Sequence, residues 1–78
     1  MGMLLYFFDI SGSVRIADKT GRHVRDSLDL RAQALMEAAS VAARESRHGK
    51  EAEIVVTVRD LTGAVCLRVR MLSQVDVP

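Results

Sequence analysis

With 78 residues, the chain is long enough for one small domain. Eleven basic and ten acidic residues leave a net charge of +1, so overall charge favours neither nucleic acid nor an acidic partner. The single cysteine excludes an intramolecular disulfide and a cysteine-rich metal site, and no apolar run resembles a signal peptide or a membrane span. We therefore expect one cytoplasmic domain over residues 1–78, without a membrane partner.

The residues before the predicted helix alternate as short strands. Residues 3–10 are aliphatic and aromatic on both faces, a pattern typical of a central strand. The Ser11-Gly12 turn leads into a second strand over residues 13–17, and a short extended segment follows over residues 22–25. This part of the chain therefore predicts a hairpin and one further short strand.

Residues 27–48 predict one long helix, because they are rich in Ala, Leu, Arg and Glu and contain neither Gly nor Pro. Asp26 is a good N-cap and Gly49 a good C-terminal cap. The apolar stripe expected to face the core comprises Leu28, Ala32, Leu35, Met36, Ala39, Ala42 and Ala43. A second stripe, made of Leu30, Ala34, Ala38 and Val41, is either the rim of the core or a contact surface.

The segment after the helix predicts a hairpin. Residues 53–60 alternate as a strand, residues 61–63 form the turn, and residues 65–71 alternate again. Residues 73–78 are expected to form a frayed tail. The order is therefore ββαββ, an α+β domain in which one long helix packs on one face of an antiparallel sheet of about four strands.

The same turn motif occurs on both sides of the helix. An Asp-x-Thr-Gly sequence begins at Asp18 and again at Asp60, each time after alternating apolar residues. Asp at the first position accepts a hydrogen bond from the backbone two residues on, and Gly at the fourth position allows positive φ. We therefore predict positive φ at Gly21 and Gly63.

The segment from Tyr6 to Asp9 resembles the Tyr-Phe-Phe-Asp opening of a family of short, uncharacterised bacterial proteins classed as a domain of unknown function. That family continues with an Asp-x-x-Gly turn, a short lead into an Ala-rich helix, and a final hairpin around a second Asp-x-x-Gly. The matching positions are Asp18, Gly21, Val24, Asp26, Arg31, Ala34, Leu35, Asp60 and Gly63, and Arg25 stands where the family often has Pro. The resemblance spans nearly the whole chain, but it implies no activity, because the family brings no established activity or catalytic residues.

No residue pattern identifies an active site. Asp18 and Asp60 are explained as turn residues, because their spacing to Gly differs from that of the Asp-Thr-Gly of aspartic proteases. Cys66 has no neighbouring base in the sequence that would generate a thiolate. His23 and His48 do not form a paired metal-binding motif. We therefore expect no enzymatic activity, no cofactor, no catalytic residue and no metal site.

The sheet face opposite the helix is the predicted interaction surface, because one helix covers only one face. Leu5, Phe7 and Val55 form an apolar strip on that face, with Arg68 and Arg70 at its rim. A strip of this kind is usually covered by protein. We therefore expect a non-enzymatic interaction module that forms a homodimer or binds another protein.

A nucleic-acid-binding module is the alternative. Nine of the eleven basic residues are Arg, and Arg15, Arg59, Arg68 and Arg70 are predicted on the same open face, near Phe7. Basic groups around an aromatic ring can hold a single strand by phosphate contact and base stacking. Such a platform usually carries two or three exposed aromatic rings, whereas this face offers one.

Overall fold

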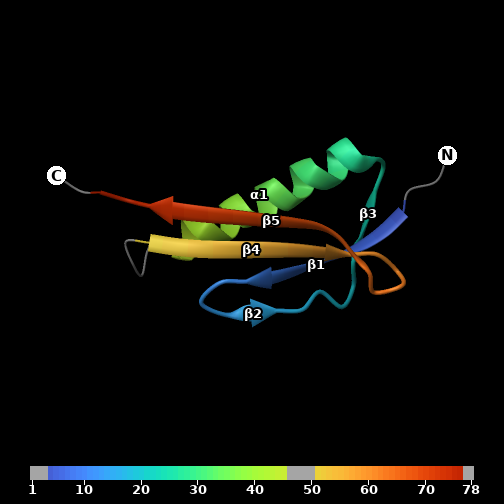
Figure 1. The fold of residues 1–78 in the computed structure, drawn as a ribbon, viewed down its shortest axis with the longest axis horizontal. Helices are drawn as coiled ribbons and strands as arrows, with labels where there is room; N and C mark the ends of the chain where they lie inside the picture. Colours follow the sequence, from blue (N-terminus) through green and yellow to red (C-terminus); the bar gives the residue numbers. More distant parts are fainter. Residues whose placement is uncertain (1–3, 46–50, 77–78) are drawn as a thin grey trace.

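The computed structural model describes residues 4–45 and 51–76. Its elements are β1 (Leu4–Ser11), β2 (Arg15–Ile16), β3 (Arg22–Val24), α1 (Ser27–Glu45), β4 (Glu51–Arg59) and β5 (Val65–Gln74). Figure 1 shows the helix lying against one face of the antiparallel sheet. The predicted α+β class, with one long helix packed on one face, is confirmed.

β1 lies inside the sheet, as its two apolar faces predict. The strand order is β2-β1-β4-β5, and β3 also pairs with β1. β3 pairs with the beginning of β1 and β2 with its end, while β4 pairs with residues 7–11. Every pairing is antiparallel, and β5 forms an edge among the described strands.

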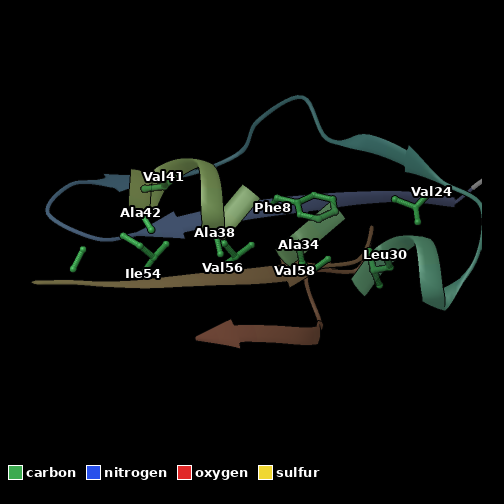
Figure 2. Packing of buried hydrophobic residues seen from close by; sticks show 11 residues of the cluster. Phe8, Val24, Leu30, Ala34, Ala38, Val41, Ala42, Ile54, Val56 and Val58 are labelled. Carbon is green, nitrogen blue, oxygen red and sulfur yellow. The ribbon is translucent and has the colours of Figure 1, made fainter. Parts of the chain in front are cut away.

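The core lies between α1 and the sheet, as Figure 2 shows. The sheet supplies the larger buried side chains, such as Phe8, Ile54, Val56 and Val58. The helix supplies three alanines, Ala34, Ala38 and Ala42, together with Leu30 and Val41. Small side chains let a helix approach a sheet closely, so the bulk comes from the strands.

The expected orientation of the helix is therefore wrong. The stripe predicted to face the core lies mostly outside it, and Leu35 is 49% exposed. The residues of the stripe treated as secondary are the buried ones, joined by Ala42. The helical period fits both stripes, and both contain several Ala residues, but the sheet buries the stripe that carries Ala34 and Ala38, each 0% exposed.

Both ends of α1 are fixed by side-chain hydrogen bonds. Asp26 caps the first turn as predicted, because its carboxylate accepts a hydrogen bond from the N–H of Asp29 at 2.8 Å. Near the other end, Glu45 accepts hydrogen bonds from the N–H and hydroxyl of Ser13, both at 2.8 Å. The helix is thereby tied to the β1–β2 hairpin. The predicted helix end at His48 and the cap at Gly49 lie outside the described residues.

The two turn glycines adopt the predicted conformation, with φ of 73° at Gly21 and 88° at Gly63. The second turn closes the β4–β5 hairpin as expected. β5 is longer than expected, since its last paired residue is Gln74, opposite Glu51. The frayed tail predicted from residue 73 therefore starts later, because β4 begins early enough to pair with this part of β5.

Candidate interaction surfaces

Two carboxylates and one guanidinium form a network on the open sheet face, opposite α1. Arg59 on β4 donates hydrogen bonds from Nε and Nη2 to the two carboxylate oxygens of Asp9 on β1, the second at 3.1 Å. Arg59 Nη2 also donates to the backbone oxygen of Asp18 at 3.3 Å, and the N–H of Asp18 donates to Asp9 at 2.9 Å. This bidentate ion pair joins β1, β4 and the loop after β2.

The carboxylate of Asp18 completes the edge of β1 where neither β2 nor β3 pairs with it. The N–H of Phe8 donates to Asp18 Oδ2 at 3.0 Å, so the carboxylate takes the place of a strand carbonyl. Asp18 Oδ1 accepts hydrogen bonds from the N–H groups of Thr20 and Gly21 at 3.1 and 2.9 Å. An unpaired backbone N–H in this position would be costly, so Asp18 has a structural role.

This environment keeps both aspartates ionised. The hydrogen bond from Arg59 holds the pKa of Asp9 below its ordinary value of 3.8, against the opposing effect of partial burial. Partial burial alone would raise the pKa of Asp18, but the backbone hydrogen bonds from Phe8 and the turn outweigh it, and that pKa is also lowered. General acid catalysis near neutral pH needs a raised carboxyl pKa. The network is therefore suited to stabilising the fold.

The five residues predicted to form an interface all lie on the open face. Leu5 and Phe7 are on β1, Val55 is on β4, and Arg68 and Arg70 are on β5. Val55 and Arg70 stand directly opposite each other in the β4–β5 ladder. The three apolar residues are half-buried, whereas the two arginines are exposed.

These apolar residues do not form one continuous strip. A polar row made of Asp9, Thr57 and Arg68 crosses three strands between Phe7 and Val55. Arg68 Nε donates a hydrogen bond to the hydroxyl of Thr57 at 3.4 Å, which links two members of this row. The open face is therefore divided into a small apolar area at each end.

The Phe7 ring is less accessible than the sequence indicated. The guanidinium carbon of Arg59 lies 5.3 Å from the ring centroid, in a cation–π arrangement. The same guanidinium is paired with Asp9. Phe7, the predicted stacking ring, and Arg59, one of the predicted phosphate-binding arginines, thus already contact other groups within the protein.

Cys66 lies at an irregularity in the β4–β5 ladder. Val58 pairs with Leu67 and Arg59 with Val65, so Cys66 is the extra residue of a β-bulge. Its thiol donates to the backbone oxygen of Val58 at 3.4 Å. Burial, and then the nearby charge of Asp60, raise the pKa of this thiol. A raised pKa disfavours the nucleophilic thiolate.

The described residues offer modest hollows rather than an enclosed pocket. An open groove of about 330 Å³ lies on the open face, lined by Asp9, Ser11, Arg15 and Thr57 among others. No group of three or more His, Cys, Asp or Glu side chains in the described ranges is placed to hold a metal ion. His23 lies on β3, and His48 falls outside the described residues. The described part of the chain also has no helix long and apolar enough to cross a membrane.

A second region, which was not predicted to be an interface, carries many of the exposed apolar side chains. We call it the α1–β5 side, and it comprises Leu28, Leu35 and Met36 of α1 together with Leu72 of β5 and Val75 just after it, which are 47–74% exposed. Leu72 is opposite Glu53 and shares the open sheet face with Arg68 and Arg70, so it lies on the other side of the sheet from α1. These are half of the ten exposed large apolar side chains among the described residues. In Figure 1, α1 and β5 lie along the same side of the molecule.

One ion pair shows toward which edge of the sheet the exposed leucines of α1 project. Glu37 on α1 binds Arg22 on β3 at 3.1 Å, so this part of the helix faces the β3 side of the sheet. Leu35 is two residues earlier and therefore projects about 200° away around the helix. Leu28 is one heptad before Leu35 and lies on the same side. Both leucines therefore lie toward the side of α1 that borders β5.

The sequence contained a signal for this surface. A helix with two apolar stripes has more apolar surface than one sheet can cover, so one stripe must remain available. Both stripes are visible in the sequence, but the one predicted to face the core is the exposed one. The correct assignment leaves the larger side chains exposed, which makes the uncovered stripe more apolar than expected.

A comparison with known proteins places the chain in a family. No curated protein and no solved structure matches it. A family model described as "Domain of unknown function (DUF6894)" matches residues 5–73, which include every described helix and strand except the ends of β1 and β5. The chain therefore belongs to the family of the domain of unknown function DUF6894.

Proposed function

We propose that the protein is a non-enzymatic interaction module that associates with a second copy of itself. The observation that carries the proposal is the α1–β5 side, where Leu28 is 74%, Met36 70% and Leu72 71% exposed. Several large apolar side chains exposed on one part of a small domain often mark a protein contact. A domain of this length also buries a modest core of its own, so covering the surface would add stability.

The α1–β5 side supports self-association better than the apolar part of the open face does. Leu5, Phe7 and Val55 are already half-buried, and Arg59 lies over the Phe7 ring. Arg68 and Arg70 are exposed on β5 and therefore border the α1–β5 side as well as the open face. The two arginines of the predicted interface thus border the surface proposed here.

The pKa values of three groups support the non-enzymatic part of the proposal. The pKa values of Asp9 and Asp18 are lowered by hydrogen bonds that stabilise the fold. The pKa of the Cys66 thiol is raised, chiefly by burial. A single cysteine in this state is compatible with the reducing cytoplasm, where we propose that the module works.

Sedimentation velocity of the wild-type protein, from low to high micromolar concentration, tests the proposal. We expect a reversible monomer–dimer equilibrium. Leu35→Glu should weaken the dimer at least tenfold, because it places an unpaired charge in an apolar contact. Val14→Glu is the matched control, since Val14 is 65% exposed in the β1–β2 hairpin, at the edge of the sheet opposite β5.

A wild-type protein that stays monomeric at high micromolar concentration would contradict the proposal. Binding of single-stranded RNA is the outcome that would replace it. In that case the affinity should fall steeply with salt, and Arg68→Ala should weaken it.

A further inference from the structure

We infer that the second copy binds by pairing its β5 with the β5 of the first copy, antiparallel and centred on Leu72. The inference rests on the proposed self-association and specifies the surface and register through which it occurs. Two-fold symmetry is the usual form of a homodimer, and it brings one strand against its own copy in antiparallel orientation. The result would be one continuous sheet running through both copies.

The position of β5 favours this pairing. Among the described strands, β5 is the longest and has a hydrogen-bonded neighbour on one side only, β4. A long edge strand presents unpaired N–H and C=O groups that accept another strand. Val75 and Asp76 continue beyond Gln74, the last residue paired with β4, so they too are available to a second strand.

The charges along β5 exclude some registers and favour others. Arg68 and Arg70 lie on the open face in the first part of the strand, and Asp76 follows its end. Centring the pairing on Val69 or Arg70 would place arginine opposite arginine, which is destabilising. Centring it on Leu72 places Arg68 opposite Asp76 of the second copy, and this cross-strand ion pair occurs twice. Centring it on Ser73 would also pair an arginine, Arg70, with Asp76, but it would place Leu72 opposite Gln74 instead of opposite its own copy.

Neighbouring charges on β4 support the same register. Glu51 is opposite Gln74, and Glu53 is opposite Leu72, in the β4–β5 ladder. With Leu72 at the centre, Arg70 of the second copy would stand beside Gln74 and approach this acidic end of β4. The basic part of each β5 would therefore face the acidic part of the other copy.

The same register also pairs apolar residues from the α1–β5 side. Leu72, which is 71% exposed, would lie opposite its own copy. Val69 packs against the core on the helix face of the sheet, and it would lie opposite Val75 of the second copy. Val75 of the second copy would share the helix face of the sheet with Val69. Because Leu35 projects toward the β5 side of α1, this valine would approach Leu35 from the sheet. The pairing would thus cover part of the exposed helix stripe.

Disulfide trapping tests the register directly. Directly opposed residues in an antiparallel ladder have Cα atoms about 4.5–5.5 Å apart, within the range that a disulfide spans. In a Cys66→Ser background, Leu72→Cys should form a disulfide-linked dimer under mild oxidation. Val14→Cys in the same background is the control, and it should stay monomeric on a non-reducing gel.

A charge exchange provides a second test. Arg68→Asp and Asp76→Arg should each weaken the dimer roughly tenfold, because like charges replace two attractive pairs. The double variant, Arg68→Asp with Asp76→Arg, should restore most of the wild-type affinity. A general loss of folding would not give this rescue, and circular dichroism of each variant checks that it is folded.

The outcomes separate this inference from the proposed function. A wild-type dimer that shows neither Leu72→Cys trapping nor charge rescue, and that Phe7→Glu dissociates, would overturn the β5 pairing and leave self-association standing. A wild-type protein that remains monomeric at high micromolar concentration would overturn both. Trapping together with rescue would establish the register.

Discussion

The two Asp-x-Thr-Gly turns have the same local structure but different surroundings. Asp18 Oδ1 accepts hydrogen bonds from the N–H and hydroxyl of Thr20 at 3.1 and 3.2 Å. Asp60 Oδ1 accepts the equivalent two bonds from Thr62 at 2.8 and 2.6 Å. Both glycines have positive φ. The local sequence therefore produces the same turn twice.

The two turns differ in what lies beyond them. A Cβ on Gly21 would lie 3.0 Å from the backbone oxygen of Tyr6 and 3.1 Å from side-chain carbons of Leu5 and Phe7, whereas one on Gly63 would meet nothing within 4 Å. The second oxygen of Asp18 binds the N–H of Phe8 on β1. The first turn is therefore a tertiary contact, while the second serves only its own hairpin.

The largest difference is expected for the glycines. Gly21→Ala should destabilise the protein by about 2–4 kcal/mol, because an unfavourable φ is combined with a backbone clash. Gly63→Ala should cost only about 1 kcal/mol, since it suffers the φ penalty alone. Denaturant unfolding of both variants measures the difference. Equal costs would show that the packing around Gly21 adds nothing to the turn.

The aspartates should give the next largest difference. Asp18→Asn should cost about 1–3 kcal/mol, because an amide cannot supply acceptors to both the turn and the N–H of Phe8. Asp60→Asn should cost less, since one amide oxygen can replace the single oxygen that the second turn uses. Urea unfolding of the two variants compares them, and a larger loss for Asp60→Asn would contradict the structural role of Asp18.

The sequence was sufficient for features that depend on neighbouring residues. The turn glycines follow from the motif itself, and the cap at Asp26 follows from its position before the helix. Strict alternation in β4 predicted that Ile54, Val56 and Val58 share a face, and all three are fully buried. These features need no knowledge of the remaining fold.

Features that depend on distant residues were not predictable in the same way. The ion pair of Asp9 and Arg59 joins positions 50 residues apart, and alternation indicates only that both face the same side of the sheet. The bond from Phe8 to Asp18 exists because β2 and β3 leave a gap along β1, and no periodicity shows that gap. The choice between helix stripes had the same origin, because it depends on how closely Ala34 and Ala38 approach the sheet.

Acid should affect the first turn more than the second. The pKa values of Asp9 and Asp18 are lowered in the folded protein, so their contribution is complete above the ordinary value of 3.8 and is lost as pH falls through the folded values. Replacing both with Asn should therefore flatten the acid side of the stability–pH curve. Asp60→Asn should flatten it less, because one carboxylate is removed instead of two. Equal flattening would show that the network around Arg59 adds nothing to the turn.

The smallest effect concerns the thiol beside the second turn. Burial first, and then the charge of Asp60, raise the pKa of Cys66, so iodoacetamide should alkylate it more slowly in the folded protein than in the unfolded chain. Asp60→Asn removes the charge but leaves the burial, and it should increase the rate by less than about tenfold, which corresponds to one pKa unit. Asp18→Asn should leave the rate unchanged, because its turn lies against β1 and does not raise this pKa. Mass spectrometry of alkylation over time at neutral pH measures all three rates, and an equal increase in both variants would mean that general loosening of the fold, rather than the charge of Asp60, controls the thiol.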